Sequence, residues 1–391
     1  MTQQPCIYLD NSATTPLSSA AKAAMLEAME QYGNPSSLHT MGQEAETLLR
    51  RAREQVLAAL GVRPRQGGTL IFTSCGTEAT SLALFGCAYA KERRTARHIL
   101  ITDSEHPSVT KAAERLEADG FSVIKISTKG GGLDLAQLDD FLANGPDLLM
   151  ASLMLVNNET GARYEVEEAF RRIKARYPEA VTHCDAVQGF LKIPFTVSSL
   201  GADLITVSGH KLHAPKGVGA LYVSPELIKK KKIIPFLVGG GQENGWRSGT
   251  ENVIGIAAFG GAAADIHGRR KAIEEHLKEL YAYAEEQLAP LELRINRPIR
   301  HVSHILHLTL PHIKSETALH FLSSKGIYVS SGSACSAHSR KTSSVLLAYG
   351  LTEQEADCSL RISFSEYTKK EDIDALAEAL AEALHRLVRI K

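Results

Sequence analysis

The feature that most constrains the fold is a regular alternation of short apolar runs with helix-like segments between residues 69 and 223. The runs are rich in Val, Ile and Leu, and helical periodicity separates most of them. This alternation is typical of an α/β protein with a mainly parallel sheet covered by helices. The predicted strands are residues 69–73, 98–102, 121–126, 147–152, 180–184, 204–208 and 218–223. The last is expected to run antiparallel, because it follows its predecessor too closely for a helical crossover.

The pattern changes near residue 251. It is helical to about residue 291, and strand signals then appear at 302–310, 328–330 and 360–364, with helices between them. We therefore expect a large domain over residues 15–258, and a smaller α+β domain made of residues 1–14 and 259–391. A long helix near the boundary is expected to bridge the two domains.

Composition excludes several classes of function. Lys plus Arg equals Asp plus Glu at 44 each, so no global charge draws this chain of 391 residues to nucleic acid or anionic lipid. The six cysteines are scattered and form no Cys-x-x-Cys pair, which argues against a metal site or a secreted disulfide framework. No basic and apolar leader opens the sequence, and no apolar run reaches about 18 residues. We expect a cytoplasmic protein that does not enter a membrane.

A lysine and an aspartate follow two of the predicted strands. Asp185 ends the run at 180–184, and Lys211 comes three residues after the run at 204–208. If these strands are parallel neighbours, both side chains lie at one edge of the sheet. An amine and a carboxylate there suit pyridoxal phosphate: the lysine forms a Schiff base with the aldehyde, and the aspartate keeps the pyridine nitrogen protonated. The alternative is an ordinary Lys–Asp surface pair.

The turn after residue 73 suits a phosphate group. Gly76 and Thr77 open a helix there, so main-chain amides, a hydroxyl and the helix dipole all favour an anion. Ser208 and His210, which flank the lysine, are further candidate phosphate donors. A glycine and threonine in such a turn can equally be a plain helix cap.

Other polar side chains follow further strands. His106 is placed to lie against the cofactor ring and to transfer protons near neutral pH, although it could instead cap a helix. Asn158 and Gln188 each offer an amide to the ring hydroxyl oxygen, and each could equally serve a turn.

Two residues of the C-terminal third suit the substrate. Arg361 faces away from the apolar side of its strand and can bind a carboxylate with two hydrogen bonds, as an amino-acid substrate requires, or it can form a surface salt bridge. Cys335 lies in a run of very small residues, 329–339, that is expected to form a mobile loop. A thiol on such a loop can reach a substrate and then an acceptor, which favours a nucleophile over a buried structural cysteine.

Taken together, these motifs closely resemble the cysteine desulfurases, the NifS/IscS-like branch of the class-V aminotransferases among the fold-type-I pyridoxal-phosphate enzymes. The resemblance covers nearly the whole chain. Its segments are YLDNSATTP at 8–16, GNPS at 33–36, TE at 77–78, EH at 105–106, NNE at 157–159, DAVQ at 185–188, SGHK at 208–211, GGGQE at 239–243, RSGTEN at 247–252, SSGSAC at 330–335, and Arg361.

The resemblance implies an activity and an assembly. L-cysteine would be converted to L-alanine, with Lys211 and His106 moving protons and Cys335 taking the sulfur as a persulfide. A homodimer is implied, in which Thr250 reaches the phosphate of the cofactor in the partner subunit and Asn34 supports Arg361. The sulfur would pass to an acceptor protein for iron–sulfur clusters, a thio-cofactor or tRNA thiolation. Selenocysteine lyase, or another fold-type-I enzyme such as an aminotransferase, is the alternative.

Overall fold

The computed structural model describes residues 6–63, 67–90, 96–331 and 342–388. Its main feature is a seven-stranded sheet in the order β2-β8-β7-β6-β5-β3-β4. Adjacent strands from β4 to β7 are parallel, whereas β8 is antiparallel to both of its neighbours, as its short connection predicted. The strands are β2 (Thr69–Thr73), β3 (His98–Thr102), β4 (Ser122–Ile126), β5 (Leu148–Met154), β6 (Val181–Asp185), β7 (Leu204–Ser208) and β8 (Gly219–Val223).

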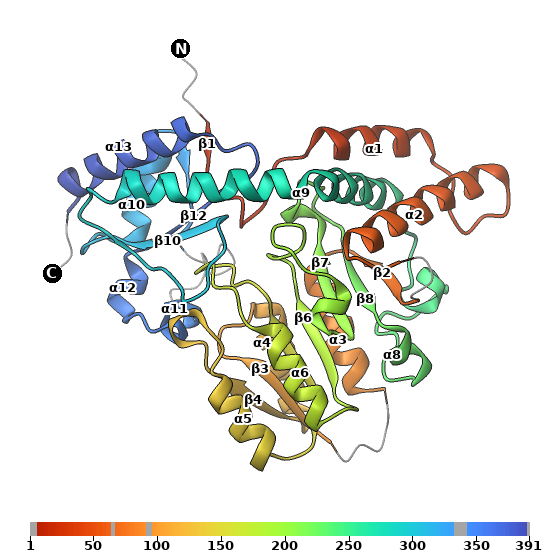
Figure 1. Cartoon of the computed structure of the whole chain (residues 1–391). Coiled ribbons are helices and arrows are strands. Elements are labelled where there is room, and N and C mark those ends of the chain that lie inside the picture. Colours follow the sequence, from red (N-terminus) through yellow and green to blue (C-terminus); the bar gives the residue numbers. More distant parts are fainter. Residues whose placement is uncertain (1–5, 64–66, 91–95, 332–341, 389–391) are drawn as a thin grey trace.

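Helices cover both faces of this sheet (Figure 1). Alternate side chains of a strand point to opposite faces, and in β2 they belong to different apolar cores. Leu70 and Phe72 pack with helices α2 (Thr40–Ala59), α6 (Val166–Arg176) and the first half of α9 (Val253–Leu288). Ile71 packs on the other side with α3 (Gly76–Ala88) and α4 (Pro107–Ala118). The remaining helices of this part are α1 (Ser19–Glu30), α5 (Leu135–Asn144), α7 (Val197–Leu200), α8 (Pro225–Lys229), and the 3₁₀ turns η1 (Lys129–Gly131), η2 (Gly209–Lys211) and η3 (Glu243–Gly245).

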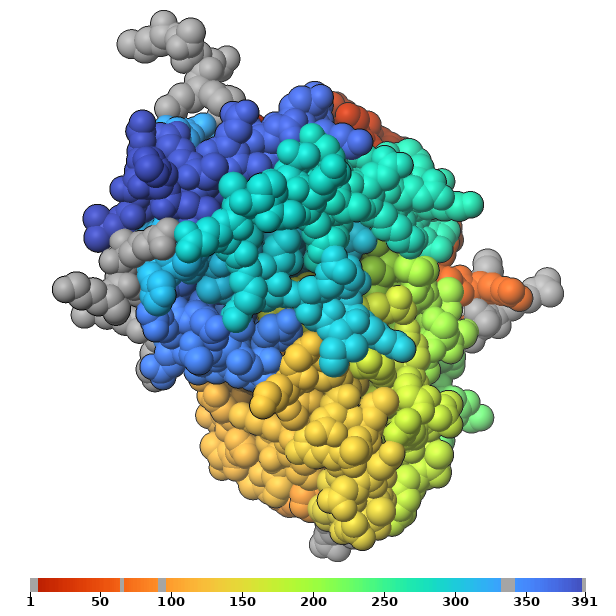
Figure 2. Space-filling model, turned by 60° about the vertical axis from the view of Figure 1, so that its left-hand side comes forward, coloured from red at the N-terminus to blue at the C-terminus, as the bar shows by residue number. Residues whose placement is uncertain are grey.

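A second apolar core lies around the C-terminal elements. Strands β12 (Ser359–Ser363), β10 (Ile305–Thr309) and β9 (Arg294–Ile295) form an antiparallel sheet in that order. The second half of α9 packs against this sheet together with α13 (Lys370–Arg386), and Figure 2 shows the blue C-terminal segment beside α9 on the surface. The other elements here are α10 (Ser315–Ser324), β11 (Ile327–Tyr328), α11 (Ser344–Tyr349) and α12 (Glu353–Asp357).

The N-terminal strand joins this second core. β1 (Ile7–Tyr8) pairs in parallel with β11, and Ile7 and Leu9 are buried among the C-terminal apolar side chains. Asp10 then bridges to Ser363 at the end of β12. The segment that follows, residues 11–15, therefore passes between the second core and the edge of the large sheet. Within the described part of the chain, no helix combines the length and the apolar character needed to span a membrane.

Candidate active site

A pocket of about 220 Å³ opens where the carboxyl ends of the parallel strands meet the segment after β1. This position is the usual ligand site of an open parallel sheet. Ten residues predicted from the sequence line it: Gly76, Thr77, His106, Asn158, Asp185, Gln188, Ser208, His210, Lys211 and Arg361. The lining is completed by Ser12, Ala13, Cys75, Ser108, Met154, Val156 and Val187.

Lys211 and Asp185 meet as expected, because β6 and β7 are parallel neighbours. The Nζ atom of Lys211 donates to the main-chain oxygens of Ser12, at 2.6 Å, and Ala13, at 2.8 Å. Asp185 is buried, and its Oδ1 accepts from the Val187 amide at 3.0 Å. Burial raises the pKa of Asp185, while the nearby charges of His106 and Lys211 act against that rise. A cationic partner such as a protonated pyridine nitrogen would offset the cost of burying this carboxylate.

The N-terminus of α3 forms a cradle for an anion. Its N-cap, Cys75, makes no side-chain capping bond, so the first amides of the helix are not satisfied by that side chain. The Ser208 hydroxyl beside them is 2% exposed and has no hydrogen-bond partner among the described residues. A Cβ atom added at Gly76 would lie 3.2 Å from Val187 Cγ2. The absence of that Cβ leaves space, and the open amides and buried hydroxyl supply donors, so these residues fit a phosphate group.

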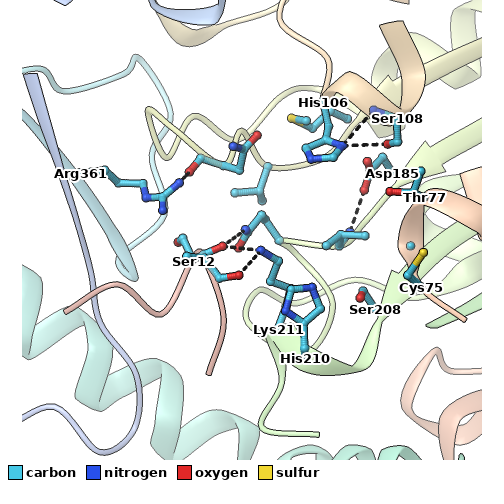
Figure 3. Close-up of a pocket in the computed structure, with 17 residues that line it drawn as sticks. Ser12, Cys75, Thr77, His106, Ser108, Asp185, Ser208, His210, Lys211 and Arg361 are labelled. Carbon is cyan, nitrogen blue, oxygen red and sulfur yellow. Dashed lines mark hydrogen bonds between the residues drawn. The ribbon is translucent and has the colours of Figure 1, made fainter. Parts of the chain in front are cut away.

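His106 is the N-cap of α4, and its ring reaches into the pocket (Figure 3). Its Nδ1 atom accepts from the Ser108 amide at 3.1 Å. The neutral ring therefore carries its proton on Nε2. Burial lowers the pKa of His106 and Lys211 lowers it further, although Asp185 acts in the opposite direction. His106 is thus held as a neutral imidazole that presents an Nε2–H donor.

Arg361 lies at the opposite side of the pocket from Thr77 and Cys75 (Figure 3). It is 1% exposed on β12. One terminal nitrogen donates to Asp10 Oδ1 at 2.7 Å, and the other donates to the main-chain oxygen of Asn158 at 2.8 Å. These contacts fix the plane of the guanidinium, whose Nε has no partner among the described residues. The distance between the phosphate cradle and Arg361 is spanned by Lys211 and His106, so a ligand with an anion at each end suits the pocket.

Three predicted site residues are not brought to this pocket. Asn34 is exposed on the loop between α1 and α2, where its side chain accepts from the Ser36 amide, so the single chain gives no support to the predicted contact with Arg361. Asp10 and Asn158 hold the arginine instead. Thr250 is exposed outside the pocket of its own chain, and its predicted role in a partner subunit stays a prediction. Cys335 lies outside the described residues.

Sequence reasoning missed the residues that orient the site. The carbonyl groups of Ser12 and Ala13 hold Lys211, and Ser108 orients His106. Main-chain carbonyls carry no residue-type signal, so the lysine contacts could not be predicted from side-chain chemistry. The contact of Asp10 with Arg361 could have been predicted, because an acidic side chain in the segment 8–16 is a natural partner for a buried arginine.

Glu105 is a buried carboxyl beside this site with a testable ionisation state. Its Oε1 accepts from Thr102 Oγ1 at 2.8 Å and from the Met154 amide at 2.9 Å, and burial raises its pKa to about 8. Because the pKa of Glu105 is higher in the folded protein than in the unfolded chain, the protonated carboxyl stabilises the fold at low pH. That contribution is lost as the pH rises from about 4.5 through about 8.

We expect Glu105→Gln to remove this loss, because glutamine is a neutral analogue of the protonated acid. The wild type should lose thermal stability between pH 4.5 and pH 8 by more than the variant does, and at pH 4.5 the two should agree within about 1 kcal/mol. Thermal unfolding of both proteins at the two pH values measures this. A variant with the same pH dependence as the wild type would show that Glu105 is ionised in the fold.

Comparison with known proteins gives one family and many similar structures. The family model described as aminotransferase class-V matches residues 7–376. A protein named cysteine desulfurase from Trichormus azollae is 38% identical over 386 residues, which cover 97% of this chain and 93% of that protein. A putative cysteine desulfurase IscS 1 from Bacillus subtilis is 36% identical and is covered to 99%.

Solved structures agree with the fold. A structure titled as a NifS-like protein superposes with a TM-score of 0.89 at 34% identity and covers 98% of this chain and 100% of its own. A NifS-like protein from Rickettsia africae gives a TM-score of 0.87 at 31% identity, with the same coverage of both chains. The fold is that of the fold-type-I enzymes, as the sequence predicted.

Proposed function

Because the chain belongs to the class-V aminotransferase family, we propose that it is a cysteine desulfurase. In the proposed reaction, the Cβ–S bond of L-cysteine breaks and a sulfur–sulfur bond forms at Cys335, so that L-alanine leaves and a persulfide remains. The observation that carries this proposal is one pocket that places Lys211 and Asp185 between an anion cradle and a buried arginine. The persulfide then serves an acceptor protein whose identity the site does not specify.

The residues of the pocket fit pyridoxal phosphate. Lys211 would hold its aldehyde, Asp185 its ring nitrogen, and Gln188 and Asn158 its ring oxygen. The phosphate would be held by Gly76, Thr77, Ser208 and His210. The Ser208 hydroxyl, which finds no hydrogen-bond partner in the described part of the chain, and the uncapped first turn of α3 support that assignment. When bound, the cofactor supplies an electron sink for the bonds at the substrate Cα.

Lys211 and His106 move the protons of the reaction. The Ser12 and Ala13 carbonyls hold the Lys211 amine, and its Nζ atom can take a proton once the amine is neutral. The neutral His106 ring already carries a proton on Nε2, so it takes a further proton at Nδ1, where Ser108 Oγ at 2.8 Å can accept from it, and the charged ring then gives a proton from Nε2. Its lowered pKa keeps the ring neutral near pH 7 between these transfers. The Cys335 thiol attacks as the thiolate, and its proton goes to His106.

Arg361 binds the carboxylate of the substrate in this proposal. We expect Arg361→Gln to raise KM for L-cysteine by about 10- to 100-fold, the loss that a charge-assisted hydrogen-bond pair carries, with a smaller effect on kcat. Arg361→Lys keeps the positive charge but not the planar pair of donors, and should recover only part of the loss. Steady-state kinetics of the two variants measure this. An unchanged KM in Arg361→Gln would remove the arginine from substrate binding.

A homodimer is the proposed assembly. Large apolar side chains are exposed on the α1–α2 region and on the segment that follows α8, among them Leu38 at 92% and Val238 at 78%. Exposed apolar side chains of this size suit a protein interface. In the dimer, Thr250 would contribute to the partner subunit's phosphate site. Sedimentation equilibrium of the full chain tests the assembly, and a monomer at micromolar concentration would contradict it.

The reaction itself is tested by product analysis. Purified protein loaded with pyridoxal phosphate should release alanine from L-cysteine without any keto acid, with one sulfur appearing for each alanine when a thiol reductant is present. Alanine formation that depends on a keto acid would identify an aminotransferase instead. Turnover with selenocysteine but not cysteine would identify a selenocysteine lyase.

A further inference from the structure

Lys192 lies behind the pocket, four residues after Gln188, and its amine contacts the Gln188 side chain. Its Nζ atom is 3.2 Å from Gln188 Oε1. The other end of the same amide, Nε2, donates to the main-chain oxygen of Ser12 at 2.9 Å. That oxygen also accepts from Lys211 at 2.6 Å. A continuous set of hydrogen bonds thus joins Lys192, through Gln188 and Ser12, to the central lysine of the site.

These contacts fix which way the Gln188 amide points. The Ser12 carbonyl can only accept, so the NH₂ group of Gln188 must face it and the carbonyl group must face Lys192. An NH₂ group has two hydrogens, and Ser12 takes one of them. Gln188 also lines the pocket, so the second N–H is available to a ligand there. Without Lys192, the amide oxygen would lose its donor, and only the Ser12 contact would hold the amide in place.

A small cavity with a mostly apolar lining lies beside Lys192 on the other side. It has a volume of about 40 Å³ and is lined by Lys192, Asn11, His304 and Glu366, among others. One buried polar atom in each of these last three side chains has no hydrogen-bond partner among the described residues. The volume is enough for one water, and these three polar atoms are the partners that a bridging water needs. His304 also makes a hydrogen bond with the Gln188 main chain, so the glutamine is held at both its side chain and its backbone.

Several charged or titratable groups surround the Lys192 amine. The charges of Lys211 and Arg361, both of which line the pocket, act on it, and His304 and Glu366 line the cavity. The charge of Lys192 also acts on His210 and His213. Burial and the two neighbouring cations lower the pKa of Lys192 to about 7. Both the charged and the neutral amine keep an N–H to donate, so the contact with Gln188 does not depend on that value.

We propose that Lys192 is a positioning residue that fixes the Gln188 amide with an N–H directed at the ring oxygen of the cofactor. The proposal rests on the proposed use of pyridoxal phosphate in this pocket. Hydrogen-bond donation to that oxygen stabilises its anionic form, and this lowers the pH at which the bound cofactor changes its visible absorbance. Lys192 acts on the cofactor only through Gln188, and it does not touch substrate.

The test uses Lys192→Met, which keeps the length of the side chain and removes the donor. We expect the dissociation constant of the apoprotein for pyridoxal phosphate to rise about tenfold, because that is the usual cost of weakening one buried hydrogen bond. The pH midpoint of the visible band should rise by about 0.5 to 1 unit, because the anionic oxygen is less stabilised. Lys192→Gln keeps an N–H donor and should restore both quantities in part.

A double-mutant cycle separates positioning from a general structural role. Gln188→Ala alone should produce shifts of similar size, and adding Lys192→Met to it should change neither quantity further. Additive effects, or a Lys192→Met protein with unchanged affinity and midpoint, would overturn the proposal. A wild-type protein that binds no pyridoxal phosphate would overturn the proposed function as well, whereas wild-type binding with an additive cycle rejects the role of Lys192 alone.

Discussion

Replacing Cys335 with alanine is expected to stop the release of alanine and sulfide from L-cysteine while leaving the visible absorbance of the bound cofactor intact. The physical reason is that the thiolate is the only group proposed to accept the sulfur, and removing a nucleophile costs about 10³-fold or more in turnover. The cofactor residues are on other elements, so its binding should not change. Turnover under steady-state conditions and an absorbance spectrum measure the two parts.

A second thiol provides the matched control. Cys75 lines the described pocket at the end where the phosphate would bind. Cys75→Ala should therefore keep most of the turnover, because no part of the mechanism uses that thiol as a nucleophile. A Cys75→Ala protein without turnover, combined with an active Cys335→Ala protein, would move the sulfur-accepting role from Cys335 to Cys75.

Lys211→Ala is expected to have an equally large effect of a different kind. The variant should lose about 10³-fold or more in turnover, because both the covalent attachment and the proton acceptor at Nζ are removed. Pyridoxal phosphate should still bind, since the anion cradle and Asp185 remain, but dialysis should remove it more readily. Turnover and retained absorbance after dialysis measure this prediction.

The control for this variant is another lysine of the same segment. Lys216 is exposed and lies outside the pocket lining. Lys216→Ala should match the wild type in turnover and in retention of the cofactor. If Lys211→Ala kept wild-type turnover, the amine would have no part in the chemistry, and another base would have to be found.

Much of the large sheet could be predicted because most of its strands are buried on both faces. Continuous apolar runs such as β3 and β7 then stand out between amphipathic helices, and both were predicted with the observed bounds. The meeting of Asp185 with Lys211 followed from one assumption, that their strands are parallel neighbours, which the structure confirms. The antiparallel β8 was also predicted correctly, because its short connection from β7 leaves no room for a helix.

Other parts of the site depend on contacts between distant segments, which a local pattern does not reveal. The ion pair of Asp10 with Arg361 joins the first strand to the last, and no periodicity relates them. The role inferred for Lys192 depends on a carbonyl group of Ser12, which has no residue-type signal. The contact predicted for Asn34 came from a resemblance alone, and the single chain places that side chain on an exposed loop.

The central claim is that the Lys211 amine forms a covalent bond with pyridoxal phosphate. Reduction of the loaded protein with borohydride makes that bond permanent, and peptide mapping by mass spectrometry then locates the label. The proposed function predicts a single phosphopyridoxyl group on Lys211. A label on any other lysine, including Lys192, or no label on a protein that has bound the cofactor, would contradict it.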